Sequence, residues 1–240
     1  MQRLPLAEGT PEGLEVWHLA LDLTAPIADD DDRLLSRAEW QRAQRFRHRA
    51  DAVRAMATRA ALRRLLSAHT GIAPEKLVFT QNAYGKPELE NAEGPAFNVS
   101  HSGRVALIAL APGGAVGVDI ERCRPEVELA PLHGLVLSPS ERRDHIGSAS
   151  LPFMERWVVK EAVLKALGLG IAEHLQALSV MPAPGPSGTY HLEHSIPVSS
   201  SLQAWSLAAP SGYAAALSYF DADCTCYAYV DQGQRYSTTF

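Results

Sequence analysis

Two long stretches of this chain space their apolar residues as an α-helix does, and each is followed by several short segments with strand-like patterns. The first stretch covers residues 51–70, with Asp51 as its cap, and the second covers residues 152–167; a glycine closes each of them. Strands are expected at residues 77–80, 97–100, 105–111, 115–121, 202–207, 213–220 and 224–230. No close sequence repeat is visible, but this order favours an α+β fold of two similar lobes.

Local sequence signals predict three further elements. A first strand is expected at residues 14–23. Ser36 and Glu39 form a capping box at the start of a short basic helix that reaches about residue 49. Residues 138–146 begin with a capping serine and a proline, so they are expected to be helical.

The composition indicates a globular chain. Its 240 residues are 46% hydrophobic, which is enough for one large domain or two small ones. No apolar run approaches the roughly 18 residues of a membrane span, and the first residues lack a secretory signal. Three cysteines are too few for a disulfide framework, and Cys224 and Cys226 lack partners at zinc-ligand spacing. We therefore expect a cytoplasmic protein without a membrane partner.

Arginine is concentrated in one part of the chain. The formal net charge is −5, but residues 33–64 hold ten arginines against two acids, a local charge of +8. The remainder of the chain therefore carries −13. A basic run of this kind is usually a solvated helix face, and nucleic-acid binding is the next interpretation. Only Trp40 and Phe46 lie among the arginines, so a platform for stacking single-stranded bases is poorly supported.

Carboxylates lie on one face of the strand expected at residues 115–121. Asp119 and Glu121 point the same way because strand side chains alternate, and Glu161 can approach them from the helix expected at 152–167. Three carboxylates would suit Mg²⁺, which prefers oxygen ligands. A pair of solvated acids on an exposed strand is the alternative, and the spacing alone favours it.

The helix expected at residues 152–167 carries a charged pair beside apolar side chains. Glu161 and Lys165 are four residues apart, so they could form a surface ion pair worth about 0.2–0.5 kcal/mol. They share their face with Trp157 and Leu164, which indicates a cleft instead. A buried charge of this kind needs a partner such as a metal or a phosphate.

A third cluster follows the strand expected at residues 97–100. Ser100, His101 and Gly103 could cradle a phosphate, with Lys86 from a preceding turn. A plain turn in which Ser100 and His101 bond local backbone groups is the alternative. Adjacent serine and histidine residues do not indicate a hydrolase triad, which is defined by geometry.

Taken in order, these segments resemble the larger, monomeric 4′-phosphopantetheinyl transferases. The resemblance covers residues 37–171 and rests on six blocks: RFRHRAD (45–51), LRRLL (62–66), YGKPEL (84–89), FNVSHSG (97–103), VGVDIE (116–121) and WVVKEAVLKALGLG (157–170). It implies transfer of the phosphopantetheine arm of coenzyme A to a serine of an apo acyl or peptidyl carrier protein, with release of adenosine 3′,5′-bisphosphate. It also implies that these carrier proteins serve the synthesis of peptides, polyketides, siderophores or fatty acids.

The resemblance further implies a fold and an assembly. The family's fold is a pseudo-two-fold α+β arrangement of two lobes, each a small, mainly antiparallel sheet packed with a long helix, with the active-site cleft between them. Residues 1–112 would form the N-terminal lobe with the coenzyme A nucleotide contacts, and residues 113–240 the C-terminal lobe with the metal ligands and the catalytic helix. A monomer is expected.

Residue roles follow from the same resemblance. Asp119, Glu121 and Glu161 match the family's Mg²⁺ ligands, a site that could also take Mn²⁺. Glu161, or a metal-bound water that it orients, would take the proton from the carrier serine, and Lys165 would contact the pyrophosphate. These matches make Asp119, Glu161 and Lys165 the expected catalytic residues.

The nucleotide phosphates would be held by residues of the N-terminal lobe. Ser100 and His101 match the pair that holds the 3′-phosphate, with Lys86 beside them. The remaining expected coenzyme contacts are the family's cations: Arg49, Arg63 and, as a further candidate, Arg47.

Two other functions compete with this one. An arginine-rich nucleic-acid-binding module would bind with an affinity that falls steeply with salt and would not depend on Asp119. A non-catalytic homologue would bind coenzyme A or carriers without turnover, although the intact acidic set argues against it.

Overall fold

The computed structural model of the chain describes residues 1–90, 93–144, 151–184, 188–197 and 202–221. Two antiparallel sheets form its centre. The first has the strand order β1-β2-β6-β5, and the second has the order β10-β11-β7. Strands of the first sheet are β1 (Gln2–Arg3), β2 (Glu15–Ala20), β5 (Ala96–Ser102) and β6 (Val105–Ala111). Strands of the second are β7 (Ala115–Arg122), β10 (Gln203–Ser206) and β11 (Tyr213–Phe220).

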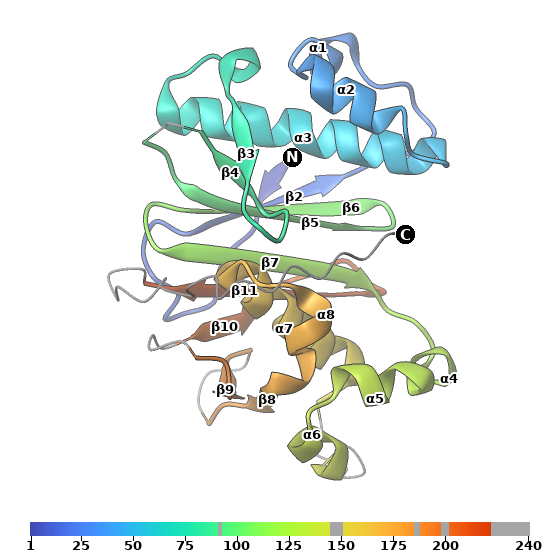
Figure 1. Cartoon of the computed structure of the whole chain (residues 1–240), viewed down its shortest axis with the longest axis vertical. Helices are drawn as coiled ribbons and strands as arrows, with labels where there is room; N and C mark the ends of the chain where they lie inside the picture. The colour runs from blue at the N-terminus through green and yellow to red at the C-terminus, as the bar shows by residue number, and fades with distance from the viewer. Residues whose placement is uncertain (91–92, 145–150, 185–187, 198–201, 222–240) are drawn as a thin grey trace.

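The two sheets pack face to face between two long helices (Figure 1). Val16 and Leu107 of the first sheet share one buried cluster with Val118 and Leu217 of the second. Helix α3 (Arg49–Thr70) covers the outer face of the first sheet, and α7 (Phe153–Leu167) covers the outer face of the second. The result is four layers, with a helix on each outside.

Smaller elements surround these layers. Two-stranded ribbons are formed by β3 (Phe79–Gln81) with β4 (Pro87–Leu89) and by β8 (Leu178–Pro182) with β9 (Tyr190–His194). Short α-helices are α1 (Asp29–Asp32), α2 (Arg37–Ala43), α4 (Glu126–Leu129), α5 (His133–Val136), α6 (Pro139–Asp144) and α8 (Ile171–His174). Single 3₁₀ turns are η1 (Pro74–Lys76), η2 (Ala130–Leu132) and η3 (Leu175–Ala177).

The expected fold class is confirmed: the chain is α+β, with two lobes that each pair an antiparallel sheet with a helix. The ends of the second long helix are also as expected, and Gly168 closes it in the left-handed conformation with φ +69°. The strand expected at residues 224–230 and the last residues of the helix expected at 138–146 lie outside the described residues.

The boundary between the first two helices differs from the expectation. The capping box of Ser36 and Glu39 is present, but α2 already ends at Ala43. Helix α3 begins at Arg49 after His48, so Asp51 lies in its first turn and is not its cap. There the carboxylate of Asp51 forms an ion pair with Arg54 at 2.7 Å. Its negative charge also interacts favourably with the positive end of the helix dipole.

No helix in the described ranges is long and apolar enough to cross a membrane.

Candidate active site

Gly117 brings β7 and α7 into unusually close contact. A Cβ added at Gly117 would lie 1.9 Å from the carbonyl oxygen of Ala162 and 2.4 Å from the amide nitrogen of Ala166. Only a glycine permits this approach between a strand and a helix. Because Asp119 follows Gly117 on the same strand face and Glu161 precedes Ala162, the contact places their two carboxylates side by side.

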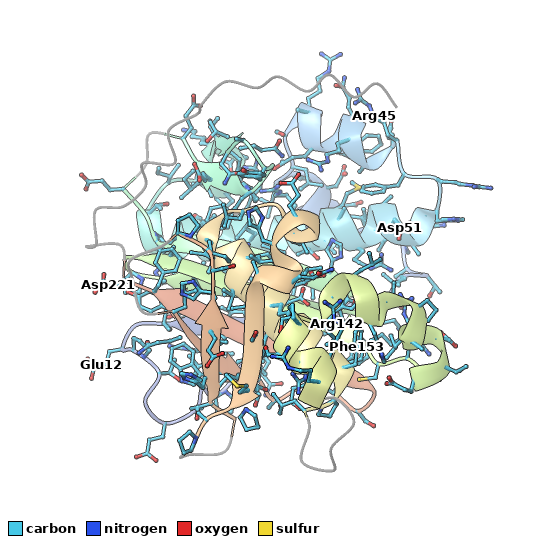
Figure 2. All side chains as sticks on the ribbon, turned by 60° about the horizontal axis from the view of Figure 1, so that its bottom comes forward. Glu12, Arg45, Asp51, Arg142, Phe153 and Asp221 are labelled. Atoms are coloured by element: carbon cyan, nitrogen blue, oxygen red, sulfur yellow. The ribbon has the colours of Figure 1, made fainter. Side chains whose placement is uncertain are left out.

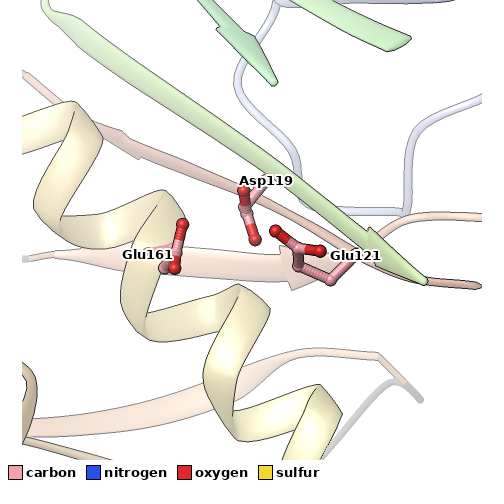
Figure 3. Close-up of side chains that lie close together, drawn as sticks. All are labelled: Asp119, Glu121 and Glu161. Atoms are coloured by element: carbon pink, nitrogen blue, oxygen red, sulfur yellow. The ribbon is translucent and has the colours of Figure 1, made fainter. Parts of the chain in front are cut away.

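Three carboxylates meet where β7 faces α7 (Figure 3). One oxygen from each of Asp119, Glu121 and Glu161 lies within 4.8 Å of the others. Asp119 is fully buried, and its Oδ2 atom has no hydrogen-bond partner among the described residues. An unpartnered carboxylate oxygen beside two further carboxylates fits an oxygen-preferring divalent cation. The sequence therefore predicted correctly that these three residues meet.

Burial shifts the proton affinities of this cluster. It raises the pKa of Glu161, and the neighbouring charge of Asp119 raises it further. Burial also raises the pKa of Glu121, opposed by a hydrogen bond from Ser102. For Lys165, burial alone would lower the pKa, but the carboxylates of Asp119 and Glu161 outweigh it and raise the pKa. The site thus concentrates negative charge, which Lys165 offsets in part.

Glu161 and Lys165 are held by their neighbours. The indole Nε1 of Trp157 donates to Glu161 Oε1 at 2.6 Å, and Lys165 Nζ lies 3.3 Å from Glu161 Oε2. Lys165 also pairs with Asp119 and donates to Ser100 Oγ at 3.3 Å. The side chains of Glu161 and Lys165 are 12% and 20% exposed, so they line the site and do not form a surface ion pair.

Ser100 and His101 point to opposite faces of β5. Ser100 lies opposite Leu107, which belongs to the core between the sheets, whereas His101 lies opposite Ala106, which belongs to the core beneath α3. Ser100 Oγ donates to Asp119 Oδ1 at 2.7 Å. The hydroxyl of Ser100 thus also contacts the acidic cluster, and its role at the 3′-phosphate stays a prediction.

His101 instead faces the beginning of α3, where Arg54 lies. Burial lowers the pKa of His101, and the charges of Arg54 and Lys165 lower it further. Arg54 Nε donates to the carbonyl of Gly103, two residues after His101 in the β5–β6 turn, at 3.0 Å. Arg54 was not among the expected site residues, because nothing in the sequence distinguishes it from the other nine arginines of residues 33–64.

Lys86 lies in the turn between β3 and β4, against the C-terminal end of α7. Its Nζ donates to the carbonyls of Val116 at 3.3 Å and Ala166 at 3.2 Å, and burial lowers its pKa to about 8. The structure thus places the Lys86 amine at the end of α7. Lys86 also lines a pocket of about 460 Å³ at the junction of the lobes, and none of the three carboxylates lines that pocket.

The arginines divide into structural and exposed residues. Arg63 is 2% exposed and donates to the carbonyls of Pro74 at 2.6 Å and Leu77 at 2.9 Å and to Glu39 at 2.8 Å. Its guanidinium is thus bound within the fold by these partners, and its contact with coenzyme A stays a prediction. Arg47 and Arg49 are exposed before and at the start of α3. Figure 2 shows Arg45 and Asp51 on this same side of the molecule.

Comparison with known proteins agrees with the site. Residues 31–113 match the family described as the N-terminal part of 4′-phosphopantetheinyl transferase, and residues 115–218 match the 4′-phosphopantetheinyl transferase superfamily. The transferase HetI of Nostoc is 33% identical over 181 residues, which is 71% of this chain and 75% of the relative. This chain belongs to the 4′-phosphopantetheinyl transferase superfamily. The expected family is thereby confirmed.

Other members of the superfamily are similarly close. The transferase Sfp of Bacillus subtilis is 28% identical over 176 residues, covering 70% of this chain and 76% of the relative. A phosphopantetheinyl transferase of Thraustochytrium is 30% identical over 189 residues, 70% of this chain and 66% of the relative. This chain is therefore a phosphopantetheinyl transferase, an enzyme that modifies carrier proteins. Its acidic cluster is consistent with the family's use of Mg²⁺ and coenzyme A.

Proposed function

We propose that this transferase moves the phosphopantetheine arm of coenzyme A to a serine of an apo carrier protein and that Asp119, Glu121 and Glu161 hold the Mg²⁺ it needs. The observation that carries the proposal is the buried, unpartnered Oδ2 of Asp119 beside two further carboxylates. When bound there, Mg²⁺ would supply positive charge to the pyrophosphate of coenzyme A and to the leaving group.

The chain's own residues supply the proton transfer. Glu161 has a raised pKa and is oriented by the indole of Trp157, so it is suited to accept the proton of the carrier serine. The serine oxygen then bonds to the phosphorus, and the bond from phosphorus to adenosine 3′,5′-bisphosphate breaks. Lys165 is close enough to the carboxylates to contact the pyrophosphate as a point charge.

The 3′-phosphate of coenzyme A is proposed to bind at His101 and Arg54. Both lie at the junction of the β5–β6 turn with α3, and exposed Arg47 and Arg49 stand at the start of the same helix. A guanidinium offers a fork of donors that matches phosphate oxygens. Ser100 and Arg63 are left out of this proposed site because their polar atoms are already bound elsewhere.

Mass spectrometry of carrier proteins tests the function. Apo acyl and peptidyl carriers are incubated with the enzyme and coenzyme A, with Mg²⁺ or with EDTA. We expect the mass of at least one carrier to increase by one phosphopantetheine group, only with Mg²⁺. No mass increase on any carrier would contradict the proposal, and an increase in EDTA would contradict its metal site.

The same assay addresses the finer proposals about partners. Carriers from peptide, polyketide, siderophore and fatty acid synthesis compete in one mixture, and the most rapidly modified class identifies the pathway. The exposed apolar side chains Val127 and Leu135, after β7, are proposed to influence this choice. We further propose that the protein is cytoplasmic and monomeric and that its lobe boundary follows residue 112. Gel filtration tests the monomeric state, and limited proteolysis tests the boundary.

A further inference from the structure

A row of side chains from β5 joins the two lobes. Strands β5 and β7 lie at the edges of different sheets, so no backbone ladder connects them. Alternate side chains of β5 instead accept hydrogen bonds from alternate amides of β7. The bonds run from Val118 N to Asn98 Oδ1 (2.9 Å), from Ile120 N to Ser100 Oγ (3.3 Å) and from Arg122 N to Ser102 Oγ (3.1 Å).

This row, which we call the polar seam, explains the pattern of β5. An edge strand leaves every second amide without a partner in its own sheet, and buried amides must be satisfied. Asn98, Ser100 and Ser102 lie on the β5 face that looks towards the second sheet, as their partners Leu107 and Val105 in β6 show. Polar residues at every second position therefore meet the edge of β7.

Two side chains of the polar seam also reach the acidic cluster. A serine hydroxyl has one hydrogen, so an oxygen that accepts from a backbone amide keeps that hydrogen for a second partner. Ser100 donates it to Asp119, as described above, and Ser102 donates it to Glu121 Oε2 at 2.8 Å. Each serine therefore links the backbone of β7 to one carboxylate of that strand from the opposite lobe.

We propose that Ser102 is a positioning residue that orients Glu121 for metal binding from across the lobe interface. The inference rests on the metal site proposed above. Glu121 lies near the end of β7 and is only half-buried. Its side chain is longer than that of Asp119, so more rotamers are accessible to it. The hydrogen bond from Ser102 to Oε2 restricts the rotation of the Glu121 carboxylate, as a partner outside the ligand set does in known metal sites.

A purely structural role for Ser102 gives a different expectation. In that case the hydroxyl serves only the Arg122 amide, and its loss would lower stability without changing metal binding. Because Arg122 is exposed, water can replace Ser102 at that amide, so Ser102→Ala is expected to fold. The two roles therefore separate when metal affinity is measured on folded protein.

The metal affinity is measured by titrating the protein with Mn²⁺ in the absence of coenzyme A and recording the electron paramagnetic resonance signal. We expect Ser102→Ala to bind Mn²⁺ about tenfold or more weakly than the wild type, while Ser102→Thr retains the hydroxyl and the affinity. In a Glu121→Ala background, Ser102→Ala should cause no further loss. Ser218→Ala is the matched control, because Ser218 is buried and its Oγ donates to the backbone carbonyl of Gln203 at 2.9 Å.

The outcomes are distinguishable. If the wild type binds no Mn²⁺, or if Asp119→Ala binds as tightly as the wild type, the proposed metal site itself is wrong and the inference falls with it. If the wild type binds and Ser102→Ala binds equally tightly, the metal site stands and the positioning role is overturned. A loss that appears in full in the Glu121→Ala background would also overturn it.

Discussion

At the scale of single residues, Gly117 decides whether β7 and α7 can meet. Its missing Cβ leaves the room occupied by the Ala162 carbonyl, 1.9 Å from where that atom would be. We predict that Gly117→Ala lowers the free energy of unfolding by about 1–3 kcal/mol, because the helix must move away from the strand. Urea unfolding measures this change.

The same displacement should separate Glu161 from Asp119, so Gly117→Ala should also weaken Mn²⁺ binding. Gly113→Ala is the control: its added Cβ would have no atom within 4 Å. We expect that variant to remain within about 0.5 kcal/mol of the wild type. Equal stability of the two variants would show that the contact at Gly117 does not constrain the helix.

The buried amine of Lys86 should make the free energy of unfolding depend on pH. Burial lowers its pKa to about 8 in the folded protein, whereas the unfolded chain has the ordinary value of 10.5. Between these values the unfolded chain binds more protons, so the free energy of unfolding rises with pH. From pH 7.5 to 10, we predict a rise of about 1–3 kcal/mol for the wild type relative to Lys86→Met.

Urea unfolding of both proteins at the two pH values provides the measurement. Lys76→Met removes an exposed lysine and should follow the pH profile of the wild type. If the difference between wild type and Lys86→Met stays constant or falls as the pH rises, the Lys86 amine is not buried as described.

Sequence reasoning at this scale used the alternation of side chains for one strand and not for another. Alternation along β7 predicted that Asp119 and Glu121 share a face. The same rule applied to β5 places Ser100 and His101 on opposite faces. By contrast, no local rule could distinguish Arg63, whose partners include the distant carbonyl of Leu77, from the other arginines of the run.

At the scale of elements, α7 is anchored by a buried ion pair between Lys160 and Glu141. Lys160 Nζ lies 2.5 Å from Glu141 Oε2 and donates to the carbonyls of Val136 at 2.7 Å and Leu175 at 2.9 Å. Both charged side chains are almost completely buried. The ion pair and the two hydrogen bonds tie α7 to α5 and α6, which precede it in the chain, and to η3, which follows it.

We predict that Lys160→Met lowers the free energy of unfolding by about 3–5 kcal/mol, because the carboxylate of Glu141 loses a buried partner. Arg33→Met, which removes one member of an exposed pair with Asp30, should change it by less than about 1 kcal/mol. Chemical denaturation of both variants gives the comparison. A change at Lys160 as small as that at Arg33 would contradict the anchoring role.

The ends of elements were predictable only where local chemistry sets them. Proline and glycine mark both ends of α7, and the sequence predicted that helix closely. The break between α2 and α3 has no such residue, and it was expected near residues 49–51, whereas α2 ends at Ala43 and α3 begins at Arg49. Strands β4, β8 and β9 are short or polar, so no apolar periodicity indicated them.

At the scale of the whole molecule, the acidic cluster belongs to both lobes. The carboxylates come from β7 and α7, while two of the hydroxyls that hold them come from β5. The two-lobed α+β fold could be predicted from the order of elements. The face-to-face packing of the sheets could not, because it depends on contacts between strands far apart in the chain.

Asp119 and Glu161 are proposed to form the metal-dependent centre of phosphopantetheinyl transfer. Rates of carrier modification, measured by mass spectrometry for Asp119→Asn and Glu161→Gln, test this proposal, because both substitutions keep the side-chain shape. We predict that each variant folds and that Glu161→Gln is about 10²–10⁴-fold slower than the wild type. We predict little detectable transfer by Asp119→Asn and unchanged transfer by the exposed control Glu12→Gln. Wild-type rates in either centre variant would contradict the claim.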